Sequence, residues 1–243
     1  MTGLLASVSS ADEAKIALRG RADIIDFKDP LSGALGSLPT ANVRAGVESV
    51  AGVVPTSATV GDHSIRALET LIKSIEVTAS TGVDYIKFGL LDADTTSLTA
   101  LATILPSVTR RHRLVAVLFA DRHHEIAWIP ILADAGCIGV MLDTATKSRR
   151  DLLSGIGRNA LRQFVAVAKQ RQLLVGLAGG LKAVDISALA ELQPDYLGFR
   201  SALCSHGERT QALEPRALAN IRDIIDKCNG AKLPIRPTYL SVT

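Results

Sequence analysis

Lysine and aspartate side chains fall at the ends of several apolar segments of this 243-residue chain. Residues 22–28 read Ala-Asp-Ile-Ile-Asp-Phe-Lys, so Asp26 and Lys28 share one face of an extended segment, because side chains alternate between faces. Lys87, inside the apolar residues 85–90, is predicted to point inward as well. A lone buried ammonium is costly unless it is paired, and Asp26 is a candidate partner.

A further carboxylate and a further amine follow another apolar segment. Asp143 ends residues 138–144, and Lys147 comes four residues later. Each has a simpler reading, because Asp143 can cap a loop, Lys147 can be surface charge and Asp26 can be a structural ion-pair partner. Together, clustered ammonium groups lower one another's pKa, and a lysine with a lowered pKa offers a free amine that attacks an aldehyde or ketone. A nearby carboxylate moves protons while the carbinolamine loses water. The predicted catalytic set for this Schiff-base chemistry is Lys28, Lys87, Asp26, Asp143 and Lys147.

Eight short apolar runs alternate with helical patterns along the chain and predict an α/β fold, a single (β/α)8 TIM barrel. A doubly wound open sheet is the alternative, but the first run is followed by Ser9 and Ser10 and not by a glycine-rich loop. We expect residues 1–230 to form the barrel and residues 231–243 an irregular C-terminal extension. The predicted strands are residues 4–8, 22–28, 54–60, 85–90, 114–120, 138–144, 173–179 and 196–202, and the clearest helical patterns are residues 10–18, 62–81, 154–170 and 213–227.

Small and polar residues at other strand ends indicate a phosphate site. In a barrel the catalytic face lies at the C-terminal ends of the strands, and loops after strands seven and eight often bind phosphate through backbone N–H groups. The alternative is that the two glycines only form a tight turn, and that the hydroxyl residues after strand three only turn the chain. The predicted substrate- and phosphate-binding residues are Ser57, Thr59, Gly179, Gly180, Arg200 and Ser201.

Composition restricts the remaining possibilities. Apolar residues make up 47% of the chain and aromatic residues 4%, and the net charge is only +3. The scattered charges and the lack of interleaved aromatic residues argue against a nucleic-acid partner. The three cysteines show no metal-ligand spacing, so we expect no metal and no cofactor. No apolar run is long enough to span a membrane, and the odd number of scattered cysteines fits a cytoplasmic protein. A homo-oligomer is expected because the exposed helices of barrels commonly assemble.

These segments resemble the (5-formylfuran-3-yl)methyl phosphate synthases of methanofuran biosynthesis, which belong to one-carbon metabolism. The similarity runs from strand two through strand eight. The Asp-Phe-Lys-Asp-Pro segment and the Asp-Thr-Ala-Thr-Lys segment are specific in combination. The matching segments are residues 22–30, 33–36, 57–62, 84–90, 140–147, 176–181 and 198–204.

The resemblance implies a lyase that condenses two molecules of glyceraldehyde 3-phosphate, with loss of phosphate and water, into a furan aldehyde carrying a methyl phosphate. It also implies that Lys28 forms the Schiff base and that Lys87 is the general base, with Asp26, Asp143 and Lys147 assisting proton transfer and phosphate loss. The residues alone leave open which of Lys28 and Lys87 forms the imine. They also leave open a Schiff-base aldolase on another sugar phosphate and a non-catalytic sugar-phosphate-binding protein.

Overall fold

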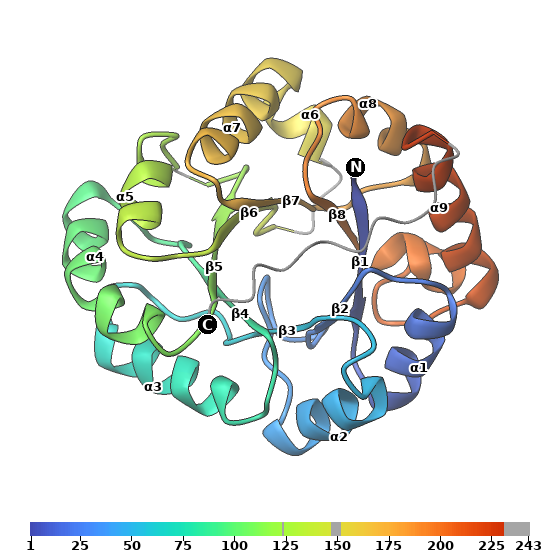
Figure 1. The fold of residues 1–243 in the computed structure, drawn as a ribbon, viewed down its shortest axis with the longest axis horizontal. Coiled ribbons are helices and arrows are strands. Elements are labelled where there is room, and N and C mark those ends of the chain that lie inside the picture. The colour runs from blue at the N-terminus through green and yellow to red at the C-terminus, as the bar shows by residue number, and fades with distance from the viewer. Residues whose placement is uncertain (123, 147–151, 231–243) are drawn as a thin grey trace.

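Each of the eight apolar runs contains a strand in the computed structural model, which describes residues 1–122, 124–146 and 152–230. All neighbouring strands pair in parallel, and β8 pairs with β1, so the strands close into a barrel in sequence order (Figure 1). The predicted (β/α)8 barrel is therefore confirmed. The strands are β1 Gly3–Val8, β2 Ile24–Phe27, β3 Thr56–Thr59, β4 Tyr85–Gly89, β5 Leu114–Phe119, β6 Gly139–Asp143, β7 Leu174–Leu177 and β8 Tyr196–Phe199.

Helices surround the barrel on the outside (Figure 1). The first predicted helix is confirmed, with Ser10 as the N-cap whose hydroxyl accepts from the Glu13 N–H. The described α-helices are α1 Ala11–Arg19, α2 Thr40–Val50, α3 Leu68–Ala79, α4 Thr95–Thr109, α5 Trp128–Asp134, α6 Leu152–Ile156, α7 Arg158–Gln170, α8 Ile186–Ala190 and α9 Pro215–Cys228. Short 3-10 turns lie at η1 Ala183–Asp185, η2 Ser201–Leu203 and η3 Ser205–Gly207.

Two predicted helices differ from the structure, one in where it begins and one in its continuity. The helix expected from residue 62 starts at Leu68, because the Asp62 carboxylate instead accepts the N–H groups of Ala34 and Leu35, at 2.8 and 2.7 Å. The helix expected over residues 154–170 is divided, because Gly157, with a positive φ of 80°, separates α6 Leu152–Ile156 from α7. The predicted C-terminal extension, residues 231–243, lies outside the described residues.

Side-chain alternation divides the core into two apolar clusters. One fills the space between the strands and the helices and includes Ile25, Phe27, Ile86 and Phe88. The other fills the inside of the barrel and includes Leu5, Tyr85, Val115, Met141 and Tyr196. Because Ile25 and Phe27 face the helices, the intervening Asp26 must face the barrel interior, as the sequence predicts.

Aspartates stabilise the opposite, N-terminal end of the barrel. Asp23, Asp84 and Asp195 each directly or closely precede a strand and accept an N–H from the neighbouring one, at 2.7 Å in every case. Polar interactions at this end of a barrel serve stability and not chemistry. These carboxylates therefore tie strand pairs together.

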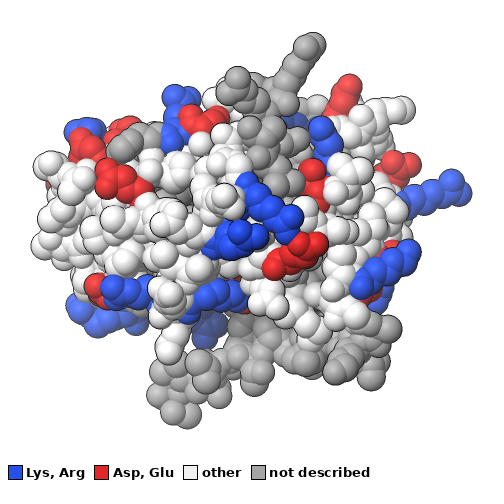
Figure 2. All heavy atoms as spheres, turned by 90° about the horizontal axis from the view of Figure 1, so that it is seen from above, with Lys and Arg blue, Asp and Glu red and all other residues white. Residues whose placement is uncertain are grey.

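The surface carries mixed charge. Figure 2 shows acidic and basic side chains lying beside one another over the face it presents. One exposed ion pair of the protein joins Arg21 Nη2 and Asp226 Oδ2, at 2.9 Å. Among the described residues, no helix is both long enough and apolar enough to cross a membrane.

The close packing of α2 on β2 gives a stability test. A Cβ at Gly46 would lie 2.1 Å from Cε1 of the fully buried Phe27 ring, so Gly46→Ala forces the helix away from the strand. We expect a loss of about 1–3 kcal/mol in the free energy of unfolding, measured by denaturant titration. The control is Gly155→Ala in α6, where a Cβ meets nothing within 4 Å. It should be neutral or stabilise by up to about 1 kcal/mol. Equal effects of the two variants would contradict the packing argument.

Candidate active site

A buried ion pair lies inside the barrel below its C-terminal rim. Lys87 Nζ is 2.6 Å from Asp26 Oδ1, and the two side chains are only 3% and 1% exposed. The Asp26 carboxylate also accepts hydrogen bonds from the hydroxyls of Ser7, at 2.9 Å, and Ser57, at 2.6 Å. Strand register explains this convergence, because Asp26 is aligned with Ser7 on one side and Ser57 on the other. Oδ1 of Asp26 therefore contacts both Ser57 and Lys87, and Oδ2 contacts Ser7.

Burial gives Lys87 an unusual acidity. Removal from water lowers the pKa of the ammonium, and the positive charge of Lys28 lowers it further. The charge and hydrogen bond of Asp26 act in the opposite direction without cancelling the effect of burial, so the pKa of Lys87 lies below the ordinary lysine value. Lys87 is therefore more easily deprotonated than an exposed lysine and suited to accept a proton from a bound molecule.

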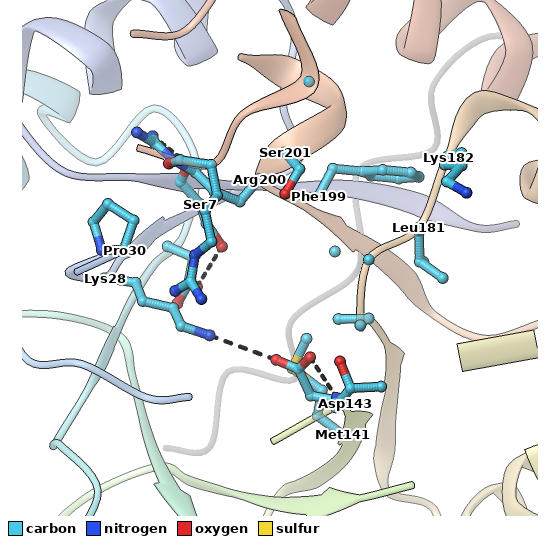
Figure 3. A pocket seen from close by; sticks show the side chains of 18 of the residues that line it. Ser7, Lys28, Pro30, Met141, Asp143, Leu181, Lys182, Phe199, Arg200 and Ser201 are labelled. Carbon is cyan, nitrogen blue, oxygen red and sulfur yellow. Dashed lines mark hydrogen bonds and ion pairs between the residues drawn. The ribbon is translucent and has the colours of Figure 1, made fainter. Parts of the chain in front are cut away.

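Lys28 lies next to this pair but in a different environment. Its backbone N–H donates to the carbonyl of Val8 at 2.9 Å, which continues the β1–β2 ladder past the end of β2. Its Nζ reaches toward Asp143 Oδ2 at 3.5 Å, as Figure 3 shows. Asp143 is oriented by the N–H of Thr144, which donates to Oδ1 at 2.7 Å. The longer separation leaves the Lys28 amine less tightly bound to its carboxylate than Lys87 is to Asp26.

These groups line one cavity of about 370 Å³ at the C-terminal ends of the strands. A cavity of this size accommodates small phosphorylated molecules. Gly179 and Gly180, after β7, both have positive φ angles, 106° and 65°. A side chain at Gly179 would also collide with Thr144, because a Cβ there would lie 2.9 Å from the Thr144 backbone nitrogen. The loop thus needs glycine to bring its backbone to the edge of the cavity.

The structure brings most of the predicted site residues together. Asp26, Lys28, Lys87, Asp143, Gly179, Gly180, Arg200 and Ser201 all line this cavity. Two others do not line it: Ser57 supports Asp26, and the Thr59 hydroxyl donates to the Gly36 carbonyl at 2.7 Å. Lys147 lies outside the described residues.

The guanidinium of Arg200 is held by the protein itself. It pairs with the Glu13 carboxylate and donates to the carbonyl oxygens of Ser7, Arg209 and Gln211. Burial opposes ionisation of Glu13, but hydrogen bonds from Arg200 and Ser9 outweigh it and hold the pKa of the carboxyl below its ordinary value. Arg200 therefore shapes the rim through a charged pair that stays ionised.

Sequence reasoning missed four residues of the site, one of which is Lys182 at the cavity edge after the glycine loop. Ser7 lines the cavity and supports Asp26, Glu13 holds Arg200, and Arg209 lines the cavity from the segment after β8. The period-two alternation of β1 signals that Ser7 faces inward. No local pattern marks Glu13 or Arg209. Within the described part of the chain, no group of three or more His, Cys, Asp or Glu residues is arranged to hold a metal ion.

Comparison with known proteins decides the family. The family model of 4-HFC-P synthase matches residues 4–222. The chain belongs to the 4-HFC-P synthase family. The matched residues include every residue that lines the cavity.

The sequence of this 4-HFC-P synthase family member aligns with most of the length of its relatives. A Methylorubrum extorquens protein, provisionally named (5-formylfuran-3-yl)methyl phosphate synthase, is 44% identical over 216 residues, which are 89% of this chain and 88% of the relative. The (5-formylfuran-3-yl)methyl phosphate synthase of Methanococcus aeolicus is 32% identical over 239 residues, 93% of this chain and 99% of the relative.

Solved structures with the same architecture are more distant in sequence. Phosphoribosyl anthranilate isomerase of Thermotoga maritima superposes with a TM-score of 0.64 at 12% identity, covering 93% of this chain and 100% of that one. For 3-hexulose-6-phosphate synthase of Salmonella typhimurium the TM-score is 0.63 at 15% identity, with the same two coverages. At such identities the similarity shows the barrel fold alone.

The charge arrangement predicts how Lys87 titrates. In NMR titrations of protein carrying ¹³C-labelled lysine ε-carbons, we expect Lys87 to lose its proton below the ordinary lysine range, because burial disfavours the ammonium. Lys28→Ala should raise the pKa of Lys87, since it removes a neighbouring positive charge. Asp26→Asn should lower it further, since it removes the stabilising carboxylate. Shifts in the same direction in both variants would contradict this electrostatic account.

Proposed function

We propose that the protein condenses two molecules of glyceraldehyde 3-phosphate into (5-formylfuran-3-yl)methyl phosphate through a Schiff base on Lys28. One inorganic phosphate and two molecules of water leave, which balances the atoms of the two trioses against the furan product. The observation that carries the proposal is the placement of the Lys28 amine at the cavity wall, between the Asp143 carboxylate and the buried Lys87–Asp26 pair. The names of the relatives support the product.

The environments of the two lysines favour Lys28 as the residue that forms the imine. Lys87 is 3% exposed and tightly paired, so its amine would have to leave the buried Asp26 carboxylate to reach a carbonyl carbon. Lys28 is 12% exposed and 3.5 Å from its carboxylate, so its amine can turn to a carbonyl carbon. In this assignment the neutral amine adds to the triose carbonyl, and Asp143 transfers protons as the carbinolamine loses water.

The second lysine then acts on the imine. An iminium makes the adjacent carbon acidic, because the positive nitrogen accepts the electron pair that the C–H bond leaves behind. Lys87, whose pKa burial lowers, is the base we assign to that proton, and Asp26 stabilises the ammonium that results. The enamine then expels phosphate or attacks the aldehyde of the second triose, and hydrolysis of the imine frees Lys28.

The glycine loop after β7 and Ser201 after β8 are assigned to one phosphate group. Backbone N–H groups at such loops bind phosphate in barrels. Lys182 follows the loop and also lines the cavity, where its charge favours an anion (Figure 3). This combination of an amine with an anion site supports a phosphorylated carbonyl compound as the substrate class. A Schiff-base aldolase would use the same lysine but would keep both phosphates.

Product analysis tests the proposal. Purified protein with glyceraldehyde 3-phosphate should release inorganic phosphate and a furan aldehyde in a one-to-one ratio, followed by a phosphate assay, absorbance and mass. Lys28→Ala should reduce the rate by roughly a thousandfold or more, because it removes the nucleophile. The control is Lys15→Ala, which removes an exposed lysine paired with Asp12 and should leave the rate unchanged. A carbon–carbon bond formed without phosphate release would indicate the aldolase. Absence of any product from folded protein would refute the synthase assignment.

A further inference from the structure

The basic side chains around the cavity differ in how they are neutralised. Three of them face carboxylates: Lys87 faces Asp26, Lys28 faces Asp143, and Arg200 faces Glu13. Arg209 also lines the cavity but, among the described residues, has no carboxylate within ion-pair distance. Its guanidinium makes one hydrogen bond to a described residue, from Nη2 to the Gly33 carbonyl at 3.3 Å. Arg209 therefore brings a positive charge to the cavity that the described residues do not neutralise by direct contact.

Three acidic residues act on Arg209 from beyond ion-pair distance: Asp143, which faces Lys28, and Asp29 and Asp62, which accept hydrogen bonds from other groups. The Asp29 carboxylate accepts from the Leu31 N–H at 2.8 Å and from the Ser32 hydroxyl at 2.6 Å. The Asp62 carboxylate accepts from the N–H groups of two residues in the loop after β2. These carboxylates attract Arg209 over a distance but leave its N–H donors available.

The segment that carries Arg209 is fixed in place. Arg200 Nε donates to the Arg209 carbonyl at 2.8 Å, and Arg200 Nη2 donates to the Gln211 carbonyl at 3.0 Å. An antiparallel bridge between Cys204 and Leu213 closes the base of the segment. Because these contacts hold the backbone on both sides of Thr210, the segment does not have to be ordered when a ligand binds, which reduces the entropic cost of binding.

We propose that Arg209 binds the phosphate of the second triose phosphate, at a subsite separate from the glycine loop. The inference rests on the proposed function, in which two phosphorylated molecules occupy the cavity together. Gly179 and Gly180 follow β7, whereas Arg209 contacts the loop after β2, and β8 and β1 lie between those strands in the barrel. A guanidinium offers a planar pair of donors that matches two phosphate oxygens. The two anion sites thus hold two phosphates apart while the carbons meet near Lys28.

Binding stoichiometry tests this subsite without catalysis. The probe is radiolabelled glycerol 3-phosphate, which has no carbonyl group and cannot form an imine, measured by equilibrium dialysis. The wild-type protein should bind two molecules per chain and Arg209→Ala only one. Arg209→Lys, which keeps the charge but loses the planar fork, should bind the second molecule at least tenfold more weakly. The control Arg216→Ala removes an exposed arginine at the start of α9 and should bind two.

Each result bears on the subsite. A single site in the wild-type protein, or two unchanged sites in Arg209→Ala, overturns the inference. If Arg209→Ala does not fold, Arg209→Lys decides, and unchanged affinity at both sites in that variant also overturns it. The test separates the subsite from the chemistry. If the wild-type protein binds two molecules, Arg209→Ala binds one and no furan product forms, only the proposed function is refuted. Furan formation with two unchanged sites in Arg209→Ala refutes the subsite alone.

Discussion

The ion pair between Asp26 and Lys87 occupies the centre of the barrel, where charged side chains are expensive to bury. Moving two charges out of water costs several kcal/mol each, and their attraction compensates only when the remaining hydrogen-bonding groups are satisfied. Ser7 and Ser57 supply these hydrogen bonds from the two strands that flank β2. Loss of either charged partner alone costs about 3–5 kcal/mol in such pairs. The register of β1, β2 and β3 therefore places both hydroxyls where they can bind the buried carboxylate.

The three cation–carboxylate pairs around the cavity have different geometries, and these suit the different roles that we propose for them. The Asp26–Lys87 pair is short and buried, and burial lowers the pKa of Lys87, the proposed base, while Asp26 opposes that effect. The Lys28–Asp143 pair is longer and opens onto the cavity, so the amine remains available to a carbonyl compound. The Arg200–Glu13 pair is charged on both sides and holds the backbone of the rim. In the proposed mechanism, one type of interaction thus supports proton transfer, covalent chemistry and positioning.

The contacts of Arg200 also explain how Arg209, near the end of the barrel sequence, reaches the site. Arg200 connects α1, through Glu13, to the carbonyl groups of the segment after β8. That segment carries Arg209 across the cavity mouth to the loop after β2. On this side of the barrel, hydrogen bonds therefore connect loops that are distant in sequence but follow neighbouring strands.

The sequence predicts the strands and the inward direction of Asp26 and Lys87 well, because both follow from alternation within single segments. Asp143 follows from its position at a strand end. The roles of Ser57, Arg200 and Arg209 depend on contacts that no local pattern contains. Glu13 and Arg200, for example, are 187 positions apart. The early start predicted for α3 has the same cause, since Asp62 binds the loop after β2 and does not begin a helix.

The central claim is that the open lysine, and not the buried one, forms the covalent intermediate. The most direct measurement is borohydride reduction of the protein in the presence of glyceraldehyde 3-phosphate, followed by peptide mass mapping of the modified lysine. The account predicts a reduced adduct on Lys28 that is absent from Lys28→Ala. An adduct on Lys87 or Lys147, or no adduct in protein that turns over the substrate, would contradict it.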